Sequence, residues 1–232
     1  MAEGLTSLGL ALDAAALAAI DGHVRLLLAW TEAINLTAIR DPAAVARLHV
    51  IDSLTAVPSL RRLDADGLLD LGSGGGFPGI PLAASLPSWR GLLVDSTGKK
   101  AAFLDTTVRA IGLHERVAVA PVRAEALAVD QRHRGRWPVV TARAVGALAE
   151  LIELAFPLLS VGGALVAWKR GPLEAELVSA GRALDAIGGG EIEVVDTSPA
   201  ALPGHRLAIV TKRSPTPAGY PRDPAERRRR PW

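Results

Sequence analysis

The chain contains no cysteine among its 232 residues. Disulfide bonds and metal sites built from thiolate ligands are therefore excluded. Radical chemistry on a cysteine-bound iron–sulfur cluster is excluded for the same reason, as is any reaction that needs a cysteine nucleophile. Whatever chemistry the protein performs must come from other residue types.

Aromatic residues and long apolar runs are also scarce. Aromatics make up 4% of the chain and hydrophobic residues 49%, so the core is built mainly from Leu, Val, Ala and Ile. No stretch of about 18 uncharged apolar residues occurs, as a membrane-spanning helix would need. The apolar start from Met1 to Ile20 lacks the basic region of a secretion signal and includes Glu3 and Asp13. These absences predict a soluble, cytoplasmic protein without membrane contact, and its length suits one large domain.

The net charge is small but unevenly distributed. The whole chain carries +2, whereas residues 205–232 contain eight Lys or Arg against two acidic residues, a net of +6. The remainder therefore carries −4. A basic end of this kind is either a solvated tail or a surface that contacts the phosphates of a nucleic acid.

A glycine-dense loop follows the apolar run at residues 68–71. Residues 72–79 read Gly-Ser-Gly-Gly-Gly-Phe-Pro-Gly, and glycine lets a backbone turn sharply and lie close to a ligand. Read from Gly74, the loop fits the G-x-G-x-x-G pattern of dinucleotide-binding proteins. Read from Gly72, it fits the G-x-G-x-G pattern of S-adenosylmethionine-dependent methyltransferases. The second register is favoured because Gly72 directly follows the strand and because two prolines would fall inside the helix of the first.

An acidic residue about 20 positions after such a loop typically hydrogen-bonds the ribose of a bound nucleoside. Asp95 meets this expectation, since it ends the apolar run Leu92-Leu93-Val94. The loop and the carboxylate together predict a cofactor that contains a nucleoside. Methylation at carbon 5 of a pyrimidine usually proceeds through a cysteine adduct, so that reaction is excluded here.

Strands and helices alternate after Gly67. The pattern predicts strands at 68–71, 92–95, 117–121, 138–142, 163–168, 191–196 and 206–212, and helices at 80–86, 99–111, 147–159 and 173–187. Strands separated by helices indicate a mostly parallel seven-stranded sheet, and the last two strands, which lack a helix between them, indicate an antiparallel edge. The pattern favours an α/β, Rossmann-like fold of the class I S-adenosylmethionine-dependent methyltransferases.

Helices precede this alternating region. The periodicity predicts one amphipathic helix from about Asp13 to Ala33 and a second from Asp41 to about Val57, ended by Pro58. We therefore expect three segments: an N-terminal helical extension at 1–66, a core that binds S-adenosylmethionine at 67–213, and a basic, flexible tail at 214–232.

Several further segments are long enough to serve as motifs specific to one protein family. They read Asn-Leu-Thr-Ala-Ile at 35–39, His-Val-Ile-Asp-Ser at 49–53, Asp-Ser-Thr-Gly-Lys-Lys at 95–100, Arg-Ala-Glu at 123–125, Thr-Ala-Arg-Ala-Val at 141–145 and Trp-Lys-Arg-Gly at 168–171. With the glycine loop, they make the chain resemble the bacterial small-subunit ribosomal RNA methyltransferase G family, also called glucose-inhibited division protein B. The resemblance covers about residues 30–222.

The resemblance implies a reaction and its participants. A methyl group would pass from S-adenosylmethionine to N7 of guanine 527, in the 530 loop of 16S ribosomal RNA, leaving S-adenosylhomocysteine. The RNA would be part of the small ribosomal subunit or a precursor, and we expect the enzyme to act as a monomer. No general base is expected, because N7 already carries a free lone pair and the protein needs only to align the reactants.

The resemblance also implies roles for individual residues. The cofactor would contact Gly72, Gly74, Gly76, Phe77, Asp95, Ala124, Glu125 and Arg143, and Arg143 would also position the reactants. The RNA would contact His49, Asp52, Ser53, Lys99, Lys100, Lys169 and Arg222. No metal site is expected.

Some interpretations stay open. Phe77 can instead pack inside the turn, Glu125 can be a surface residue, and the trio His49, Asp52 and Ser53 can anchor helices rather than meet RNA. Family members usually carry a cation where this chain has Leu48, with Arg47 one residue earlier. A small-molecule methyltransferase on the same fold and a non-catalytic nucleoside- or RNA-binding scaffold are the alternative functions.

Overall fold

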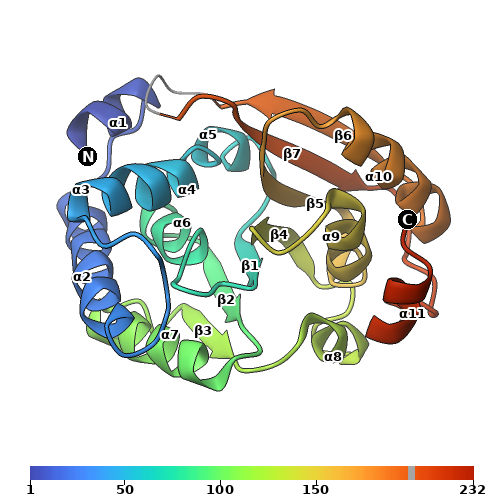
Figure 1. Cartoon of the computed structure of the whole chain (residues 1–232), viewed down its shortest axis with the longest axis horizontal. Coiled ribbons are helices and arrows are strands. Elements are labelled where there is room, and N and C mark those ends of the chain that lie inside the picture. The colour runs from blue at the N-terminus through green and yellow to red at the C-terminus, as the bar shows by residue number, and fades with distance from the viewer. Residues whose placement is uncertain (198–201) are drawn as a thin grey trace.

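A seven-stranded sheet crosses the middle of the molecule in the computed structural model, which describes residues 1–197 and 202–232 (Figure 1). The strands are β1 (Gly67–Leu71), β2 (Arg90–Val94), β3 (Val117–Ala120), β4 (Trp137–Arg143), β5 (Leu159–Arg170), β6 (Gly190–Asp196) and β7 (His205–Lys212). Their order is β3-β2-β1-β4-β5-β7-β6. Only β7 pairs antiparallel, with β5 and with β6. The predicted sheet is confirmed, with the reversed strand second from the edge.

Successive side chains of the central strands point to opposite faces of the sheet. Leu68 and Val139 join one hydrophobic cluster, whereas Leu69 and Val140 join the other. The first face is covered by the N-terminal helices with α6 (Gly79–Ser85) and α7 (Gly98–Ala110), the second by α8 (Ala124–Val129), α9 (Leu148–Ala155) and α10 (Glu174–Ile187). Burial on both faces explains why these strands read as continuous apolar runs.

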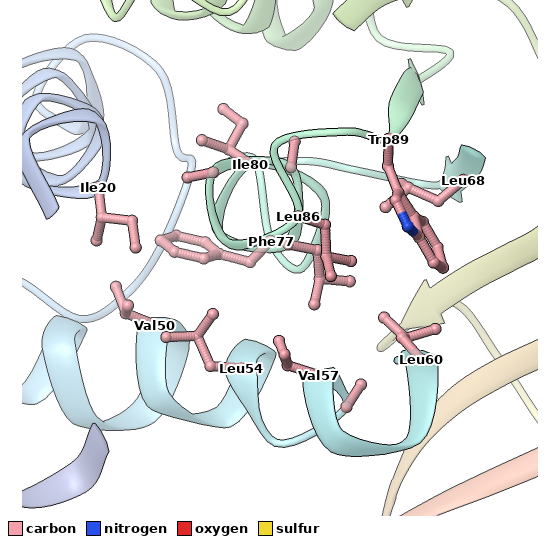
Figure 2. Packing of buried hydrophobic residues seen from close by; sticks show 14 of the residues in the cluster. Ile20, Val50, Leu54, Val57, Leu60, Leu68, Phe77, Ile80, Leu86 and Trp89 are labelled. Atoms are coloured by element: carbon pink, nitrogen blue, oxygen red, sulfur yellow. The ribbon is translucent and has the colours of Figure 1, made fainter. Parts of the chain in front are cut away.

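The N-terminal helices pack against the glycine loop and α6. They are α1 (Ala2–Ser7), α2 (Ala14–Thr31), α3 (Pro42–Val45), the π-helix Ala46–Ile51, α4 (Asp52–Leu54) and α5 (Val57–Leu60). Figure 2 shows Val50, Leu54 and Val57 of this layer directed toward Phe77 and Leu86. The apolar side chains of these helices therefore pack against the glycine loop as part of one hydrophobic core.

The predicted helix from Asp41 to Val57 is wrong in its interior and at its end. Asp41 caps it as expected and accepts a hydrogen bond from the Ala44 N–H at 2.6 Å. The chain then widens into a π-helical turn, and Pro58 lies in the first turn of α5 instead of ending a helix. Proline is tolerated there because the first N–H groups of a helix have no intrahelical partner.

Two elements of the second face also differ from the prediction. Helix α8 was not predicted, because its six residues are too few for a periodic pattern to emerge. Helix α9 ends at Ala155 rather than near residue 159. Phe156 keeps helical backbone angles, but Pro157 after it has no N–H with which to continue the helix.

The C-terminal segment is a packed part of the structure and not the flexible tail expected for residues 214–232. It contains α11 (Pro224–Arg229), which Figure 1 shows beside α8. Asp223 caps α11 by accepting hydrogen bonds from the N–H groups of Ala225 and Glu226, at 2.8 and 2.9 Å. Arg134 holds the preceding stretch by donating to the backbone carbonyls of Tyr220 and Pro217, at 3.0 and 3.1 Å. These contacts are long-range, so composition alone does not indicate them.

Candidate functional site: two adjoining cavities at the strand ends

The glycine loop begins where β1 ends, as the favoured register requires. The N–H groups of Gly72 and Ser73 both donate to the carbonyl of Val94, at 2.8 and 3.0 Å, which ties the loop to the end of β2. Gly72 has a φ of +69°, a backbone conformation that residues other than glycine rarely adopt. A Cβ added to Gly72 would also lie 2.8 Å from a methyl carbon of Val145. The position therefore requires glycine for two independent reasons.

Two aspartates hold the ends of this loop. The Asp95 carboxylate accepts hydrogen bonds from the N–H groups of Gly74 and Thr97, at 3.0 and 2.8 Å. The buried Asp70 accepts from the Thr141 hydroxyl at 2.7 Å and from the Gly79 N–H at 3.2 Å. Burial raises the pKa of Asp70 to about 6, against the opposing effect of these hydrogen bonds.

A cavity of about 240 Å³ opens beside the loop. Four residues predicted to bind the cofactor line it together: Gly72, Asp95, Ala124 and Glu125. They come from the ends of β1 and β2 and from the start of α8, which follows β3. The carboxyl ends of parallel strands form the usual ligand site of such sheets. The structure thus brings these four residues together, and it adds Val145 and Arg227, which had not been predicted.

Two of the predicted loop residues, Gly76 and Phe77, pack toward α2 and do not line this cavity. Phe77 is buried, and its ring lies 4.6 Å from His23 of α2 and 4.9 Å from His49, measured between ring centroids. The guanidinium of Arg143 lies over the same ring, 5.3 Å from its centroid. Phe77 therefore packs within the turn, as the alternative interpretation expected, and Gly76 lies beside His23.

His23 supports the loop from α2 and had not been predicted. It is fully buried, and its Nε2 donates to the carbonyl of Gly75 at 2.7 Å. Its Nδ1 has no hydrogen-bond partner among the residues that the structure describes. Burial lowers the pKa of His23 to about 4, so the imidazole is neutral near pH 7. A single histidine on an apolar helix face gives no sequence signal that separates this role from core packing.

A larger cavity, of about 550 Å³, lies on the other side of residues 143–146. One of its lining residues is the buried Asp52, whose carboxylate pairs with Arg143 at 2.9 Å and with His205 at 2.7 Å. The indole N–H of Trp168 donates to the carbonyl of Asp52 at 2.7 Å. Arg143, Asp52 and His49 all line this cavity, so the predicted positioning residue and two predicted RNA contacts lie together.

Ser53 does not join them. His49 and Asp52 line the cavity, but Ser53 is buried and its hydroxyl donates to the His49 carbonyl at 2.6 Å. The expected shared face of the trio is therefore wrong for Ser53. Burial and the nearby charge of Arg143 lower the pKa of His49 to about 4. π-Helical turns often occur at functional sites, which fits the position of His49.

The predicted RNA-contacting cations fall in different places. Lys169 lines the larger cavity, where its ammonium pairs with Glu176 at 2.7 Å and donates to the Gly146 carbonyl at 2.9 Å. Lys99 and Lys100 lie on the first turn of α7, where Lys99 is exposed and Lys100 is half-buried. Arg222 is mostly buried against Glu153, so it is part of the protein interior rather than an open contact surface.

The substituted family position has a visible consequence. Leu48 lines the larger cavity, whereas Arg47 lines a separate hollow beside α1 with Gly4 and Ile51. The neighbouring cation therefore does not replace the missing one at this cavity mouth. Arg170 and His205, which line the same cavity, were not singled out from the sequence: Arg170 lies in the quoted segment 168–171 without an assigned role, and His205 lies in no quoted segment.

Residues 143–146 form the partition between the two cavities. Ala144 and Gly146 line the larger one, and Val145 lines the smaller one against Gly72. Ala144 has a φ of +58°, which is uncommon for a residue other than glycine and typical of functional turns. The two cavities therefore border the same short turn, so ligands bound in them would both lie beside it.

Two features are absent from residues 1–197 and 202–232. No cluster of three or more His, Cys, Asp or Glu side chains suited to a metal ion occurs there. None of the helices described combines the length and the apolar character that crossing a membrane requires.

The architecture is that of the class I S-adenosylmethionine-dependent methyltransferases. An O-methyltransferase from Bacillus cereus, solved in complex with SAH, matches with a TM-score of 0.55 over 82% of this chain and 90% of that one, at 16% identity. A protein from Corynebacterium glutamicum matches with a TM-score of 0.55 over 83% and 90%, also at 16% identity. At this identity the likeness concerns the fold.

Sequence similarity then defines the family. The profile of the GidB family, described as rRNA small subunit methyltransferase G, matches residues 16–209. The ribosomal RNA small subunit methyltransferase G of Roseiflexus castenholzii is 40% identical over 220 residues, which cover 94% of this chain and 92% of the relative. That of Deinococcus radiodurans is 44% identical over 202 residues, covering 85% and 78%. The chain belongs to the GidB family, and the resemblance stated from its motifs is confirmed.

Proposed function

We propose that the protein transfers a methyl group from S-adenosylmethionine to N7 of the guanine at position 527 in the 530 loop of 16S ribosomal RNA. One observation carries the proposal. A glycine-lined cavity of about 240 Å³ and a charged cavity of about 550 Å³ adjoin across the turn at residues 143–146. A donor on one side and a base on the other would meet at that turn, and the relatives named above are methyltransferases of small-subunit ribosomal RNA.

The smaller cavity fits an adenosyl cofactor by its chemistry. Gly72 leaves room that a Cβ would fill, and Asp95 places a carboxylate beside the loop at the distance along the chain expected for a ribose contact. Ala124 and Glu125 would border the base of the nucleoside. When bound, S-adenosylmethionine supplies a methyl group activated by a sulfonium centre. No dinucleotide is proposed, because the glycine loop begins at Gly72, directly after β1.

The larger cavity fits a flipped purine held by polar groups. Guanine O6 is an acceptor that a guanidinium donor suits, whereas the neighbouring N7 lone pair stays free to accept the methyl group. Arg143 is fixed by Asp52 and rests on Phe77, so its position is set before any base enters. Such preorganisation reduces the entropic cost of aligning two reactants. No side chain is required to take a proton, because N7 already carries an available lone pair.

The RNA surface would extend outward from the larger cavity. Lys169 and Arg170 line that cavity, and Lys99 is exposed at the start of α7. Contacts of lysine and arginine with phosphates orient a nucleic acid without reading its sequence. We propose a ribosomal particle or its precursor as the substrate and a monomer as the active form.

The test is methylation of small ribosomal particles that lack this modification, with the purified protein and radiolabelled S-adenosylmethionine. Strand scission at 7-methylguanine, read by primer extension, should map the label to the 530 loop. Naked 16S RNA and a mixture of small-molecule acceptors serve as controls. Label at another base, or turnover of small molecules without RNA, would contradict the proposal.

A further inference from the structure

Arg227 of α11 is the one feature of the C-terminal segment that reaches the smaller cavity among the described residues. Its guanidinium pairs with the carboxylate of Glu125, and its side chain is only 11% exposed. Burial alone would raise the pKa of Glu125, but the hydrogen bond and charge of Arg227 keep that pKa below its ordinary value. The predicted cofactor residue Glu125 is thus held by a residue more than 100 positions away in the sequence.

The position of Arg227 is itself fixed by an internal anchor. Glu153 of α9 is fully buried and accepts two hydrogen bonds from the Arg222 side chain, at 2.9 and 2.6 Å. The indole of Trp232 donates to the same carboxylate at 2.7 Å and lies beneath the Arg222 guanidinium, 4.3 Å from its ring centroid. Arg227 in turn donates to the Arg222 carbonyl at 2.9 Å. A chain of contacts therefore runs from the core of α9 to the cavity wall.

One donor of Arg227 is left over. Its Nε is buried and has no hydrogen-bond partner in the part of the chain that the structure describes, and a carboxylate oxygen of Glu150 lies 3.9 Å from it. Glu150 also lines the smaller cavity. Because this Nε is covered by protein, Arg227 acts on the cavity through its pair with Glu125.

We propose that α11 is a wall of the cofactor site and that Arg227 is a positioning residue for the adenosyl end of the cofactor, acting through Glu125. The inference rests on the proposed use of S-adenosylmethionine and assigns the C-terminal segment to cofactor binding. Its basic composition had suggested contact with RNA. Within α11 the neighbours Arg228 and Arg229 are exposed, so the same helix provides matched charges that do not reach Glu125.

The experiment is calorimetric titration of the full-length protein with S-adenosylhomocysteine. We expect R227A to raise the dissociation constant about tenfold, the loss typical of one charge-assisted contact. R227K should recover part of the affinity, because an ammonium can still pair with Glu125. R228A and R229A remove the same charge from the same helix and should stay within about twofold of the wild type.

A purely structural role is separated by kinetics. R227A should raise the KM for S-adenosylmethionine while kcat at saturating cofactor and the KM for the ribosomal particle stay unchanged. E125Q removes the negative charge of the Arg227–Glu125 pair. The double variant R227A/E125Q should lose no more affinity for the cofactor than either single variant, because both substitutions break the same pair. Where R227A proves too unstable to titrate, R227K and E125Q decide the question at a melting temperature matched to the wild type.

Each outcome has one meaning. Wild-type affinity in R227A and E125Q, or a raised KM for the particle alone, would overturn the role of Arg227 while the proposed function stands. A wild-type protein that does not bind S-adenosylhomocysteine would overturn the proposed function and this inference with it. Selective loss of cofactor affinity in R227A, with R228A and R229A unaffected, supports the inference.

Discussion

The two cavities share a wall but are built in different ways. The smaller one is shaped by backbone: turns that follow β1, β2 and β3, with peptide N–H groups held by Asp95 and a glycine at the point of closest approach. The larger one is shaped by side chains from separate segments, including Asp52 from the N-terminal helices, Arg143 from β4 and His205 from β7. The first depends on local geometry, the second on charges brought together by folding.

This difference predicts how each cavity responds to substitution. A backbone-built site fails when a side chain is added, because the turn has no room for it. A charge-built site fails when a side chain is removed, because its buried partner loses compensation. The following substitutions test the contrast.

The largest effect is expected at Arg143. Removing the guanidinium in R143A should lower turnover on the order of 1,000-fold, since alignment and charge at the reacting centre are lost together. The variant should also lose stability on the order of 3 kcal/mol, because Asp52 stays buried without its cation. Methyl transfer and denaturant unfolding measure the two losses separately.

The double variant D52N/R143A separates positioning from packing. It removes the stranded charge, so stability should recover in part while turnover stays low. Recovery of turnover in the double variant, or near-normal turnover in R143A, would mean that Arg143 serves only the fold.

The next largest effect is expected at His23. Its pKa is about 4 in the folded protein, against an ordinary value of 6.5, because it is buried. The unfolded state therefore binds the proton more readily, and stability present above pH 6.5 is lost as the pH falls toward 4. The difference between wild type and H23Q should amount to about 3 kcal/mol at most over this window.

The contribution of Asp70 to stability changes with pH in the opposite direction to that of His23. The effect of His23 is therefore measured as the difference between wild type and H23Q. Its pKa is raised to about 6 by burial, so the folded state favours its protonated form and gains stability as the pH falls through that value. Both variants retain Asp70, so its contribution cancels in the difference. Parallel acid-unfolding curves for wild type and H23Q would show that His23 is not the titrating group.

A smaller effect is expected at Gly72. In G72A the new methyl would meet Val145, and the φ of +69° disfavours alanine. Affinity for S-adenosylhomocysteine should fall about tenfold, measured by calorimetry. G98A is the matched control, since Gly98 begins α7 and nothing lies within 4 Å of its added Cβ. Equal affinity in both variants would refute a close approach of the cofactor at Gly72.

The smallest effect is expected at the exposed start of α7. The double variant K99A/K100A should raise the KM for the ribosomal particle about threefold and reduce the salt dependence of binding, with cofactor affinity unchanged. Measuring the KM at two salt concentrations checks both points. A KM that keeps its wild-type value and salt slope would remove these lysines from the RNA surface.

The site residues show where motif reasoning worked. Gly72, Asp95, Ala124 and Glu125 were predicted from the loop and the resemblance, and they meet in one cavity because each follows the end of a neighbouring strand. Ser53 was misplaced because its hydroxyl bonds back to the His49 carbonyl, a contact that the spacing of the trio does not reveal. Arg222 was assigned to RNA by its charge, although its partner Glu153 lies 69 positions away and is buried.

Local sequence was sufficient for the alternation of strands and helices, the start of the glycine loop and the family, because each depends on neighbouring residues and their periodicity. Tertiary structure alone decided that His205 joins Asp52, that His23 supports the loop and that α11 closes the smaller cavity. These contacts form because buried charges and hydrogen-bond donors must be paired in the folded protein. Residues far apart along the chain carry no mutual pattern that would reveal them beforehand.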